Sequence, residues 1–453
     1  MVARQSRRLT GSVSRRFRKL RELRPVVTVE RLGPDGRGRA TFEDRPVRIH
    51  GALPEEEVRI RYIGARRGAD DAVVEEVISA SPDRVAAPCK YAELCSGCSL
   101  QHASLEAQLA FKEERLRRHF QQSGCEPQNW LDPITGPTLG YRRRGRLSVR
   151  FVRKKERVLV GFREKNGRYV ADIEQCPVIV PAIGEQISAI AHMLDGLEGR
   201  NDIPQVEFAA GDDAAALVFR HMQPLQPTDL ARLEEFGRET CLRVYLQAGG
   251  PDTVTALWPQ NAGLLSYSLP EHDVELSFGP TDFVQVNAEL NRNLVNQVLS
   301  LLAPESKNRV LDLFCGLGNF SLPLARQAGL VIGVEGDARL VALARDNAQR
   351  NGIGNVEFHA ADLINGTEAE AWCTEPVDRI LLDPPRAGLG QAGARVTAMQ
   401  ARRIVYVSCN GETLAEDAKN IVATGRYRFV AAGAVDMFPH TAQGEAIALF
   451  EAA

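Results

Sequence analysis

One stretch of this sequence limits the possible folds more than any other: residues 309–325, which read Arg309-Val-Leu-Asp-Leu-Phe-Cys-Gly-Leu-Gly-Asn-Phe-Ser-Leu-Pro-Leu-Ala. The apolar start predicts a buried strand over 309–313, the two glycines predict a tight turn, and a helix is expected to begin near Asn319. Glycine is needed where the backbone lies flat against a ligand at the carboxyl edge of a parallel sheet. The stretch therefore predicts a nucleotide-binding unit.

The strands expected after this turn each end in a polar residue. The second strand, 331–335, ends in Glu335, where a carboxylate can accept both hydroxyls of a ribose. Position 321 is Ser, whereas a dinucleotide fingerprint requires Gly or Ala there. Later strands are expected before Asp362, Asp383 and Cys409, and strands alternate with helices from residue 286 onward. This alternation predicts a parallel sheet covered by helices.

Four consecutive strands with polar residues at their carboxyl ends resemble the class I S-adenosylmethionine (SAM) methyltransferase fold, which is α/β and Rossmann-like. An unrelated Rossmann-like domain is the alternative. The resemblance implies that the cofactor is lined by Phe314, Gly316, Asn319, Glu335 and Asp362.

The motif Asp383-Pro-Pro-Arg386 and the thiol of Cys409 bear on what is methylated. Enzymes that methylate an exocyclic amine carry Tyr or Phe where this chain has Arg386. A thiolate that adds to carbon 6 of a pyrimidine makes carbon 5 nucleophilic, so Cys409 has a clear use if carbon 5 is the target. Glu445, just before the last apolar strand at 446–450, is the candidate base for the carbon-5 proton, with His440 as the alternative. The other cysteines outside the cluster described below are read as structural: Cys125, Cys241, Cys315 and Cys373.

Together these residues resemble the RNA uracil-C5 methyltransferase family over residues 25–453. Phe283-Val-Gln-Val-Asn matches a family segment, and the resemblance implies that Gln285 and Asp383 reach the cofactor and that Cys409 and Glu445 are catalytic. Two positions depart from the family pattern: Gly411 stands where Pro usually follows Ser-Cys-Asn, and Gln443 replaces the second His of the terminal motif. Glycine at 411 is expected to loosen the loop behind the thiol.

Three closely spaced cysteines and one distant cysteine suggest a metal site. Their spacing is Cys89-x5-Cys95-x2-Cys98, with Cys176 followed by Pro177. Four thiolates hold a [4Fe-4S] cluster, but four cysteines also make a tetrahedral zinc site, and spacing alone does not decide between them. The family resemblance implies a [4Fe-4S] cluster with a structural role.

The N-terminal third predicts a small barrel followed by a helix. Residues 25–80 read as five short strands at 26–31, 37–42, 47–50, 58–63 and 73–79. This pattern predicts a closed, OB-like barrel and resembles the TRAM domain of RNA-modifying enzymes. A helix is expected over 101–122, with Leu105, Leu109 and Leu116 on one face and packed on the catalytic domain.

The expected protein is multidomain. It has a basic tail at 1–24, the TRAM barrel at 25–82, a central α+β domain with the cluster at 83–280, and the SAM methyltransferase domain at 281–453.

The charge of the chain is strongly uneven. Net charge is −2, yet residues 1–24 hold nine basic residues against one acidic, and residues 141–170 hold twelve against two. In 141–170 the basic residues lie in strand-like sequence beside Tyr141, Phe151, Phe162 and Tyr169. Cations and rings on a sheet are what unstacked RNA requires. Phosphate contacts are expected from Arg142, Arg143 and Arg144.

Family members with both the barrel and the cluster methylate uridine 1939 of 23S ribosomal RNA, which is therefore the implied substrate and partner. The alternatives are a uracil-C5 methyltransferase of tRNA or another rRNA site, an iron-sulfur redox enzyme, and a non-catalytic RNA-binding assembly factor. No apolar run approaches the ~18 residues of a membrane span, and no apolar signal segment follows the N-terminus. A cytoplasmic monomer without membrane contact is expected.

Overall fold

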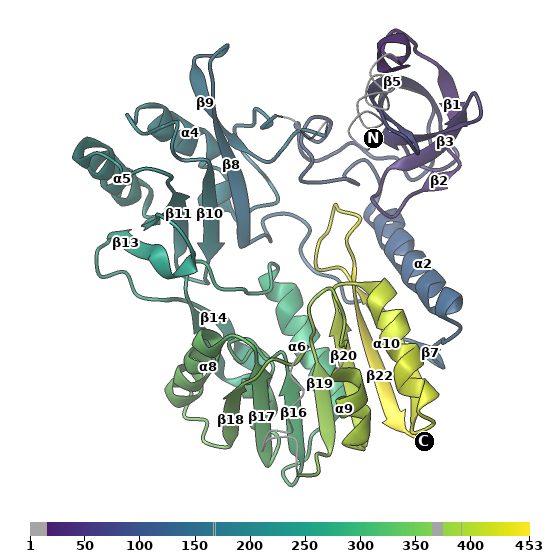
Figure 1. The fold of residues 1–453 in the computed structure, drawn as a ribbon, viewed down its shortest axis with the longest axis vertical. Helices are drawn as coiled ribbons and strands as arrows, with labels where there is room; N and C mark the ends of the chain where they lie inside the picture. The colour runs from purple at the N-terminus through teal and green to yellow at the C-terminus, as the bar shows by residue number, and fades with distance from the viewer. Residues whose placement is uncertain (1–15, 166, 168, 365–374, 391) are drawn as a thin grey trace, which may run out of the picture.

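The structure is a computed structural model that describes residues 16–165, 167, 169–364, 375–390 and 392–453. The chain forms an N-terminal barrel, a central sheet beside it, and a C-terminal α/β domain below both in the view of Figure 1. Most of the predicted tail, residues 1–15, and Cys373 lie outside the described residues. No helix among the described residues is long and apolar enough to cross a membrane.

The N-terminal barrel has six strands where five were predicted, because the first predicted strand bends into two short ones. Their order is β1-β5-β6-β4-β3-β2. The segment that forms β1 and β2 pairs with β5 through its first half and with β3 through its second half, which joins the two edges of the sheet. The strands are β1 Val26–Thr28, β2 Arg31–Leu32, β3 Gly38–Phe42, β4 Arg45–His50, β5 Glu57–Ala65 and β6 Asp70–Ser79.

Residues 16–24, predicted as part of a tail, pack on the barrel. Leu20 is buried in the barrel core together with Val47 and Ile60. Arg16 forms an ion pair with the buried carboxylate of Asp70. The part of the basic segment that the structure describes is therefore attached to the barrel.

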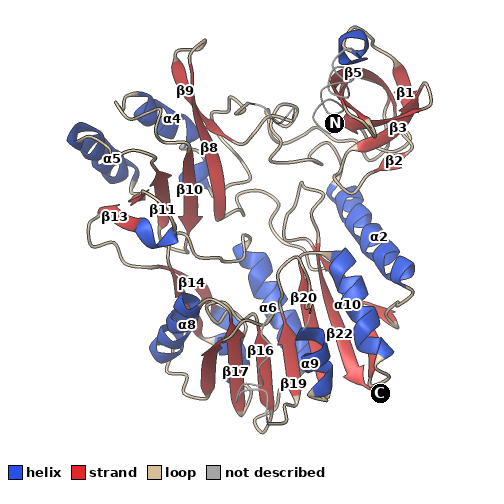
Figure 2. Ribbon diagram, viewed as in Figure 1, coloured by secondary structure: helices blue, strands red, loops and turns tan. Residues whose placement is uncertain are grey.

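The central sheet has the order β13-β12-β11-β10-β8-β9, with helices α4 and α5 packed on it (Figures 1 and 2). A two-stranded hairpin then leads into the C-terminal domain. The elements are β8 Arg144–Val152, β9 Arg157–Gly161, α3 Pro181–Gly184, α4 Ile187–Asp195, β10 Gln205–Ala210, β11 Ala215–Arg220, α5 Pro227–Thr240, β12 Arg243–Gln247, η1 Pro251–Thr253, β13 Val254–Trp258, β14 Leu265–Leu269, η2 Pro270–His272 and β15 Val274–Phe278.

The C-terminal domain is built on an eight-stranded sheet of order β18-β17-β16-β19-β20-β22-β21-β7. The first five strands are parallel, and β22 is antiparallel to both β20 and β21. Its elements are α6 Ala288–Leu302, β16 Arg309–Leu313, α7 Ser321–Ala325, β17 Leu330–Glu335, α8 Ala338–Arg350, β18 Val356–Ala360, β19 Arg379–Leu382, α9 Ala392–Ala398, β20 Arg403–Ser408, α10 Gly411–Ala423, β21 Tyr427–Val435 and β22 Glu445–Ala452, with β7 Asn129–Trp130 at the far edge.

Both faces of this sheet are covered, as the apolar runs of its parallel strands require. Alternate residues of β16 show the division: Val310 packs in a core with α6, α7 and α8, and Leu311 packs in a second core with α2, α9 and α10. The predicted parallel sheet covered by helices is therefore present, and β16 has the predicted bounds.

Helix α2 Leu105–Ser123 packs on α10 and β21, but its buried face differs from the prediction. Leu105 is 45% exposed. The buried residues recur every fourth position and are Gln108, Lys112, Leu116 and Phe120. Leu116 is buried as predicted, but two of the four buried residues are polar, so hydrophobic spacing alone did not identify the whole buried face.

Candidate active site

The turn after β16 places backbone against open space at the carboxyl edge of the sheet. Phe314, Gly316 and Gly318 all have positive φ, at 66°, 56° and 96°. A positive φ is uncommon for a residue with a side chain, such as Phe314, and is unstrained for glycine. The N–H of Gly316 donates to Oε2 of Glu335 at 3.1 Å. A Cβ added at Gly316 would meet nothing within 4 Å, so the turn leaves room for a ligand beside the backbone.

Three carboxylates gather beneath this turn. Asp312 is fully buried; its Oδ2 accepts a 2.5 Å hydrogen bond from Ser321, and its Oδ1 has no hydrogen-bond partner among the described residues. Burial raises the pKa of Asp312 to about 7, and the charges of Asp383 and Glu335 add to the shift. Burial, with the charge of Glu335, likewise raises the pKa of Asp383 to about 7. This uncompensated negative potential favours a cationic ligand.

Sequence reasoning missed Asp312, although a signal was present. It is the one acidic residue inside the otherwise apolar core of the strand 309–313. Its hydrogen-bond donor is Ser321, the residue that departs from the dinucleotide fingerprint. The departure therefore has a structural use, which is to hold a buried carboxylate under the glycine turn.

Other residues predicted to bind the cofactor have partners within the protein. Asn319 exchanges amide hydrogen bonds of 2.9 and 3.0 Å with Asn291 of α6. Asp362 is exposed and accepts the N–H of Ile364 at 3.0 Å. Gln285 is buried, and its backbone carbonyl accepts the Nε–H of Arg143 at 2.8 Å. The side-chain amide of Asn319 thus links the glycine turn to helix α6 through these hydrogen bonds.

Cys409 and Glu445 meet at the same sheet edge. Cys409 follows the last residue of β20, and Glu445 is the first residue of β22, where the sequence placed it just before the strand. Burial raises the pKa of the Cys409 thiol, and the charges of Glu445 and Asp383 raise it further. Burial, reinforced by Asp383, raises the pKa of Glu445 to about 8. Glu445 is buried and Cys409 is partly buried, so both groups tend to keep their protons in the free protein.

Arg386 is a second residue whose position sequence reasoning did not give. Its side chain lies near Cys409 and Glu445, and its charge lowers the pKa of both groups against the dominant effect of burial. The backbone carbonyl of Arg386 accepts Nδ2 of Asn410 at 3.1 Å. The Asp-Pro-Pro-Arg motif therefore brings one cation to the thiol and the carboxylate together.

Gly411 was expected to loosen a loop. In the structure it is instead the first residue of helix α10. Asn410 caps this helix by accepting the N–H of Glu412 at 3.2 Å. A Cβ on residue 411 would stand 3.1 Å from Cδ1 of Leu116, so glycine allows α2 to approach closely. A helix N-terminus next to Cys409 favours the thiolate.

The four cysteines predicted to bind a cluster line one cavity: Cys89, Cys95, Cys98 and Cys176. Burial raises the pKa of Cys95 to about 11 and that of Cys98 to about 12, and the neighbouring thiols add to both shifts. The described residues contain no group of three or more His, Cys, Asp or Glu side chains placed to hold a single metal ion. The four thiols therefore share one cavity.

Of the three arginines expected to contact phosphate, Arg143 is buried, and Arg142 and Arg144 are partly exposed. Arg143 is 2% exposed, and its guanidinium lies 4.3 Å from the centre of the Tyr267 ring. Arg144 donates to the carbonyl of Thr281 at 2.7 Å, and Arg142 lines the cysteine cavity. The expectation was wrong for Arg143, which is buried just before β8, and it stays a prediction for Arg142 and Arg144.

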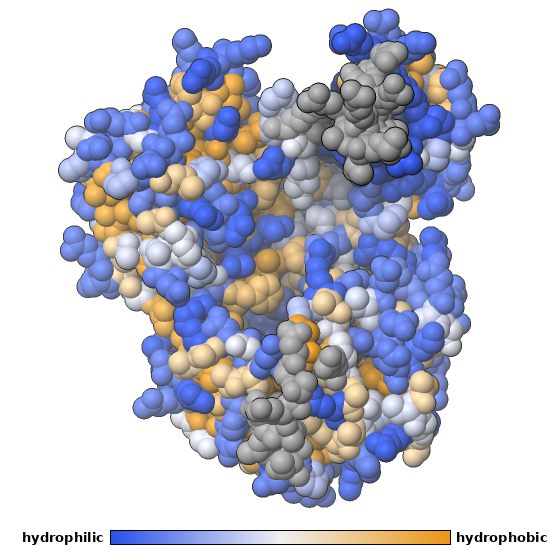
Figure 3. Space-filling model, viewed as in Figure 1, coloured by the Kyte–Doolittle hydropathy of each residue, from blue (hydrophilic) through white to orange (hydrophobic). Residues whose placement is uncertain are grey.

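The basic residues of the β8–β9 hairpin that face solvent lie farther along it. Arg150, Arg153 and Lys154 are exposed and have no ion pair among the described residues. Hydrophilic side chains cover this tip in Figure 3. Of the four aromatic residues in the segment, Tyr169 is the most accessible at 63%, and Tyr141 is buried. The exposed basic surface is thus smaller than predicted and centred on the hairpin tip.

A covered parallel sheet with a glycine turn above carboxylates, and a thiol facing a carboxylate at the same edge, defines a SAM-type methyltransferase domain. The family model described as tRNA (Uracil-5-)-methyltransferase matches residues 106–452, and the chain belongs to this family. This result confirms the resemblance drawn from the sequence.

Full-length relatives carry a more specific name. Two proteins called 23S rRNA (uracil(1939)-C(5))-methyltransferase RlmD are similar to this chain. The protein from Alkalilimnicola ehrlichii is 46% identical over 97% of this chain and 99% of its own. The protein from Methylococcus capsulatus is 48% identical over 93% of this chain and 96% of its own.

A solved structure shares the fold over nearly the whole chain. The tRNA (uracil-54, C5)-methyltransferase of Pyrococcus abyssi, in complex with S-adenosyl-L-homocysteine, is 25% identical and has a TM-score of 0.72. The similarity covers 94% of this chain and 99% of that one.

Proposed function

We propose that this protein transfers a methyl group from SAM to carbon 5 of a uridine in 23S ribosomal RNA, at the position equivalent to 1939. The names of relatives that are 46–48% identical over at least 93% of this chain support the substrate. The observation that carries the chemistry is the placement of Cys409 opposite Glu445, beside Asp383. Carbon-5 methylation needs both a nucleophile and a base, and this edge supplies both.

The residues at the edge fit SAM. Its sulfonium and ammonium charges suit the three crowded carboxylates, and the open space at Gly316 admits a ligand against the backbone. Glu335 and Asp362 follow neighbouring strands, where they would bind the ribose and the adenine side. When bound, SAM supplies a methyl group made electrophilic by the sulfonium.

The proposed reaction uses this chain's own groups in two steps. The Cys409 thiolate adds to carbon 6, and the electrons of the 5,6 double bond move toward the carbonyl at carbon 4. Carbon 5 then attacks the methyl carbon, and the broken bond leaves its electron pair on sulfur. In the second step Glu445 takes the proton from carbon 5, the 5,6 double bond re-forms, and the thiolate leaves.

The electrostatics of the site match these roles. A pKa of about 8 makes the Glu445 carboxylate a stronger base than an ordinary glutamate, and it takes the carbon-5 proton once it has lost its own. Burial disfavours the Cys409 thiolate, and the contact with Arg386 offsets part of that effect. Arg386 is therefore proposed to assist the addition step.

We also propose that Cys89, Cys95, Cys98 and Cys176 hold a [4Fe-4S] cluster. Four sulfurs at ~2.3 Å from one zinc ion would stand only ~3.8 Å apart. In a cluster each thiolate binds a different iron, so the sulfurs surround a shared space. Four thiols that line one cavity are placed as the ligands of such a cluster would be. Its role would be structural.

The remaining organisation is proposed on the same basis. The closed barrel at 25–82 is proposed to be a TRAM domain that binds RNA, with the β8–β9 tip as a second RNA contact. Residues 83–280 form the central domain and 281–453 the methyltransferase domain. Helix α2 belongs to the central segment but packs on the methyltransferase sheet.

Labelled methyl transfer tests the substrate directly. The protein is incubated with labelled SAM and, separately, with 23S RNA, 16S RNA and bulk tRNA from cells lacking the enzyme, and the product is mapped. The proposal predicts label at carbon 5 of one uridine in 23S RNA. Label in tRNA would favour the substrate of the solved neighbour instead. No transfer to any RNA would favour a redox enzyme or an assembly factor.

A further inference from the structure

The segment before Glu445 is held by side chains outside the sheet. Residues 436–444, here called the terminal segment, connect the end of β21 to Glu445 and belong to neither strand. Its conformation is unusual at His440, which has a φ of 65°. Backbone hydrogen bonds hold it at two points, where Asp436 donates to Ile134 and the carbonyl of His440 accepts from Ser99 and Leu100, and side chains hold the rest.

Three residues on one stripe of α2 supply such contacts. Lys112 forms a buried ion pair with Asp436 and donates to the carbonyl of Phe438 at 3.0 Å. Gln108 accepts the N–H of His440 at 2.8 Å. Each of these side chains is almost fully buried and polar, which is costly unless it is bonded.

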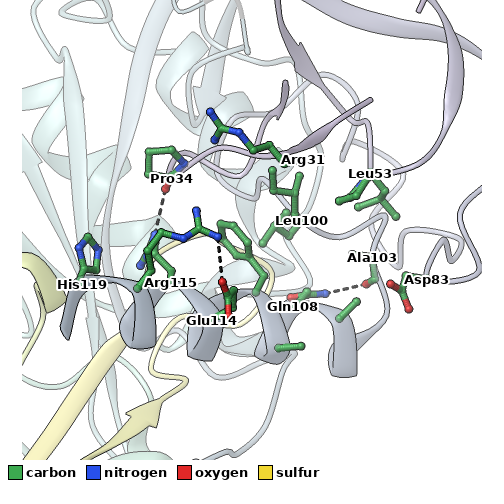
Figure 4. A pocket seen from close by; sticks show the side chains of 16 residues that line it. Arg31, Pro34, Leu53, Asp83, Leu100, Ala103, Gln108, Glu114, Arg115 and His119 are labelled. Carbon is green, nitrogen blue, oxygen red and sulfur yellow. Dashed lines mark hydrogen bonds and ion pairs between the residues drawn. The ribbon is translucent and has the colours of Figure 1, made fainter. Parts of the chain in front are cut away.

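Arg115 completes the stripe one turn farther along. Its NH1 donates to the carbonyl of Ala442 at 2.7 Å and to the carbonyl of Pro34, in the β2–β3 turn of the barrel, at 3.0 Å. Figure 4 shows Gln108 and Arg115 along α2, with Arg115 reaching Pro34 across a cavity of about 490 Å³. The barrel, α2 and the terminal segment therefore meet at one guanidinium.

We propose that Gln108, Lys112 and Arg115 are positioning residues that hold the terminal segment so that Glu445 stands opposite Cys409. The stripe 108, 112, 115 has the spacing that normally carries apolar core residues. Here it is polar, and its hydrogen bonds run to the chain just before the proposed base. This inference rests on the proposed function.

The two catalytic groups depend on different supports. Cys409 is placed by β20 and by the capped start of α10, whereas Glu445 also depends on the terminal segment. A base must come within hydrogen-bond reach of its proton, and a displacement of about 1 Å can cost on the order of 100-fold in rate. Loosening the stripe should therefore slow the second step and spare the first.

The test compares Arg115→Met and Gln108→Leu with wild type in single turnover. Methyl transfer to RNA should stay within about twofold, and decay of the methylated protein–RNA adduct on denaturing gels should slow about 10–100-fold. Arg115→Lys should restore part of the decay rate. The matched control is Arg118→Met, which removes the same charge from α2 but loses only a bond to Glu114. Lys112 is unsuited to the test because its loss leaves Asp436 as an unpaired buried charge.

RNA containing 5-fluorouridine separates positioning from misfolding. Its adduct needs no base, because fluorine cannot leave as a cation, so the variants should form it at the wild-type rate. Variants that trap 5-fluorouridine normally and also release natural product at the wild-type rate would overturn the proposal. So would variants that lose methyl transfer and adduct formation together. A wild-type protein that forms neither adduct nor 5-methyluridine would overturn the proposed function itself.

Discussion

Cys409 and Glu445 flank one cross-strand pair, because Ser408, the last residue of β20, pairs with Ala446, the second residue of β22. The register of this pair is set by the buried residues of both strands, including Tyr406 and Phe450. A slip of one residue would turn Glu445 to the other face of the sheet. The chemistry thus depends on a strand register rather than on nearness in sequence.

Glu445→Gln should change how stability depends on pH. Burial raises the pKa of Glu445 from 4.5 to about 8, so the folded protein holds a proton that the unfolded chain releases above pH 4.5. Stability from this group is therefore present at low pH and is lost as the pH rises toward 8. Glutamine removes the effect. Thermal denaturation should show a variant whose Tm exceeds that of wild type by about 5 °C at pH 9 and by little at pH 5. A constant difference across this range would contradict the raised pKa.

Arg386→Gln should slow formation of the Cys409 adduct. The arginine opposes the effect of burial on the thiol, so its loss leaves a smaller thiolate fraction at neutral pH. A slower rate of adduct formation is therefore expected at pH 7 with 5-fluorouridine RNA. The rate should recover at higher pH. Equal rates at pH 7 would show that the arginine does not assist the thiol.

The catalytic domain was largely readable from its sequence because its signals are local. The strand 309–313, the glycines after it and the polar strand ends all lie within short windows, and the structure has β16, β17 and β20 close to the predicted bounds. Cys409 follows β20 and Glu445 begins β22, and the antiparallel pairing of these two strands brings the end of one to the start of the other. The spacing of the two residues in the sequence does not predict the register of β20 against β22, which sets their relative position.

The predictions that proved wrong, for the buried face of α2 and for Arg143, concern residues whose partners are far away in the sequence. Gln108 and Lys112 are buried because Asp436 and His440, more than 300 positions later, supply hydrogen bonds. Arg143 is buried because a carbonyl of Gln285 and the Tyr267 ring receive it. A short stretch of sequence predicts that a polar residue is exposed, because the partner that allows its burial lies elsewhere in the chain.

Charge reversal at the hairpin tip should weaken RNA binding without harming the fold. The triple variant Arg150→Glu, Arg153→Glu, Lys154→Glu removes three exposed cations. If each contacts a phosphate of single-stranded RNA, the slope of log affinity against log salt should fall by about 2. Arg157, already paired with Asp172, provides a control in Arg157→Gln. An unchanged slope in the triple variant would mean that these charges are only solvated.

Protein purified without oxygen should carry iron in the cysteine cavity. We expect about four irons per chain and broad absorbance near ~400 nm. Replacing Cys89, Cys95, Cys98 or Cys176 by serine should remove the absorbance, whereas Cys241→Ser, at an exposed position outside the cavity, should leave it unchanged. Stoichiometric zinc without iron would refute the cluster.

The most direct test of the mechanism follows the covalent adduct in two variants. Wild type, Cys409→Ala and Glu445→Gln are each incubated with the RNA and SAM labelled in its methyl group, then separated on a denaturing gel. The account predicts that Glu445→Gln accumulates a protein–RNA band carrying the methyl label, because addition and transfer proceed and only proton removal fails. Cys409→Ala should give neither a labelled band nor methylated RNA. Normal turnover by Glu445→Gln, or methylated uridine from Cys409→Ala, would contradict the assignment of these two residues.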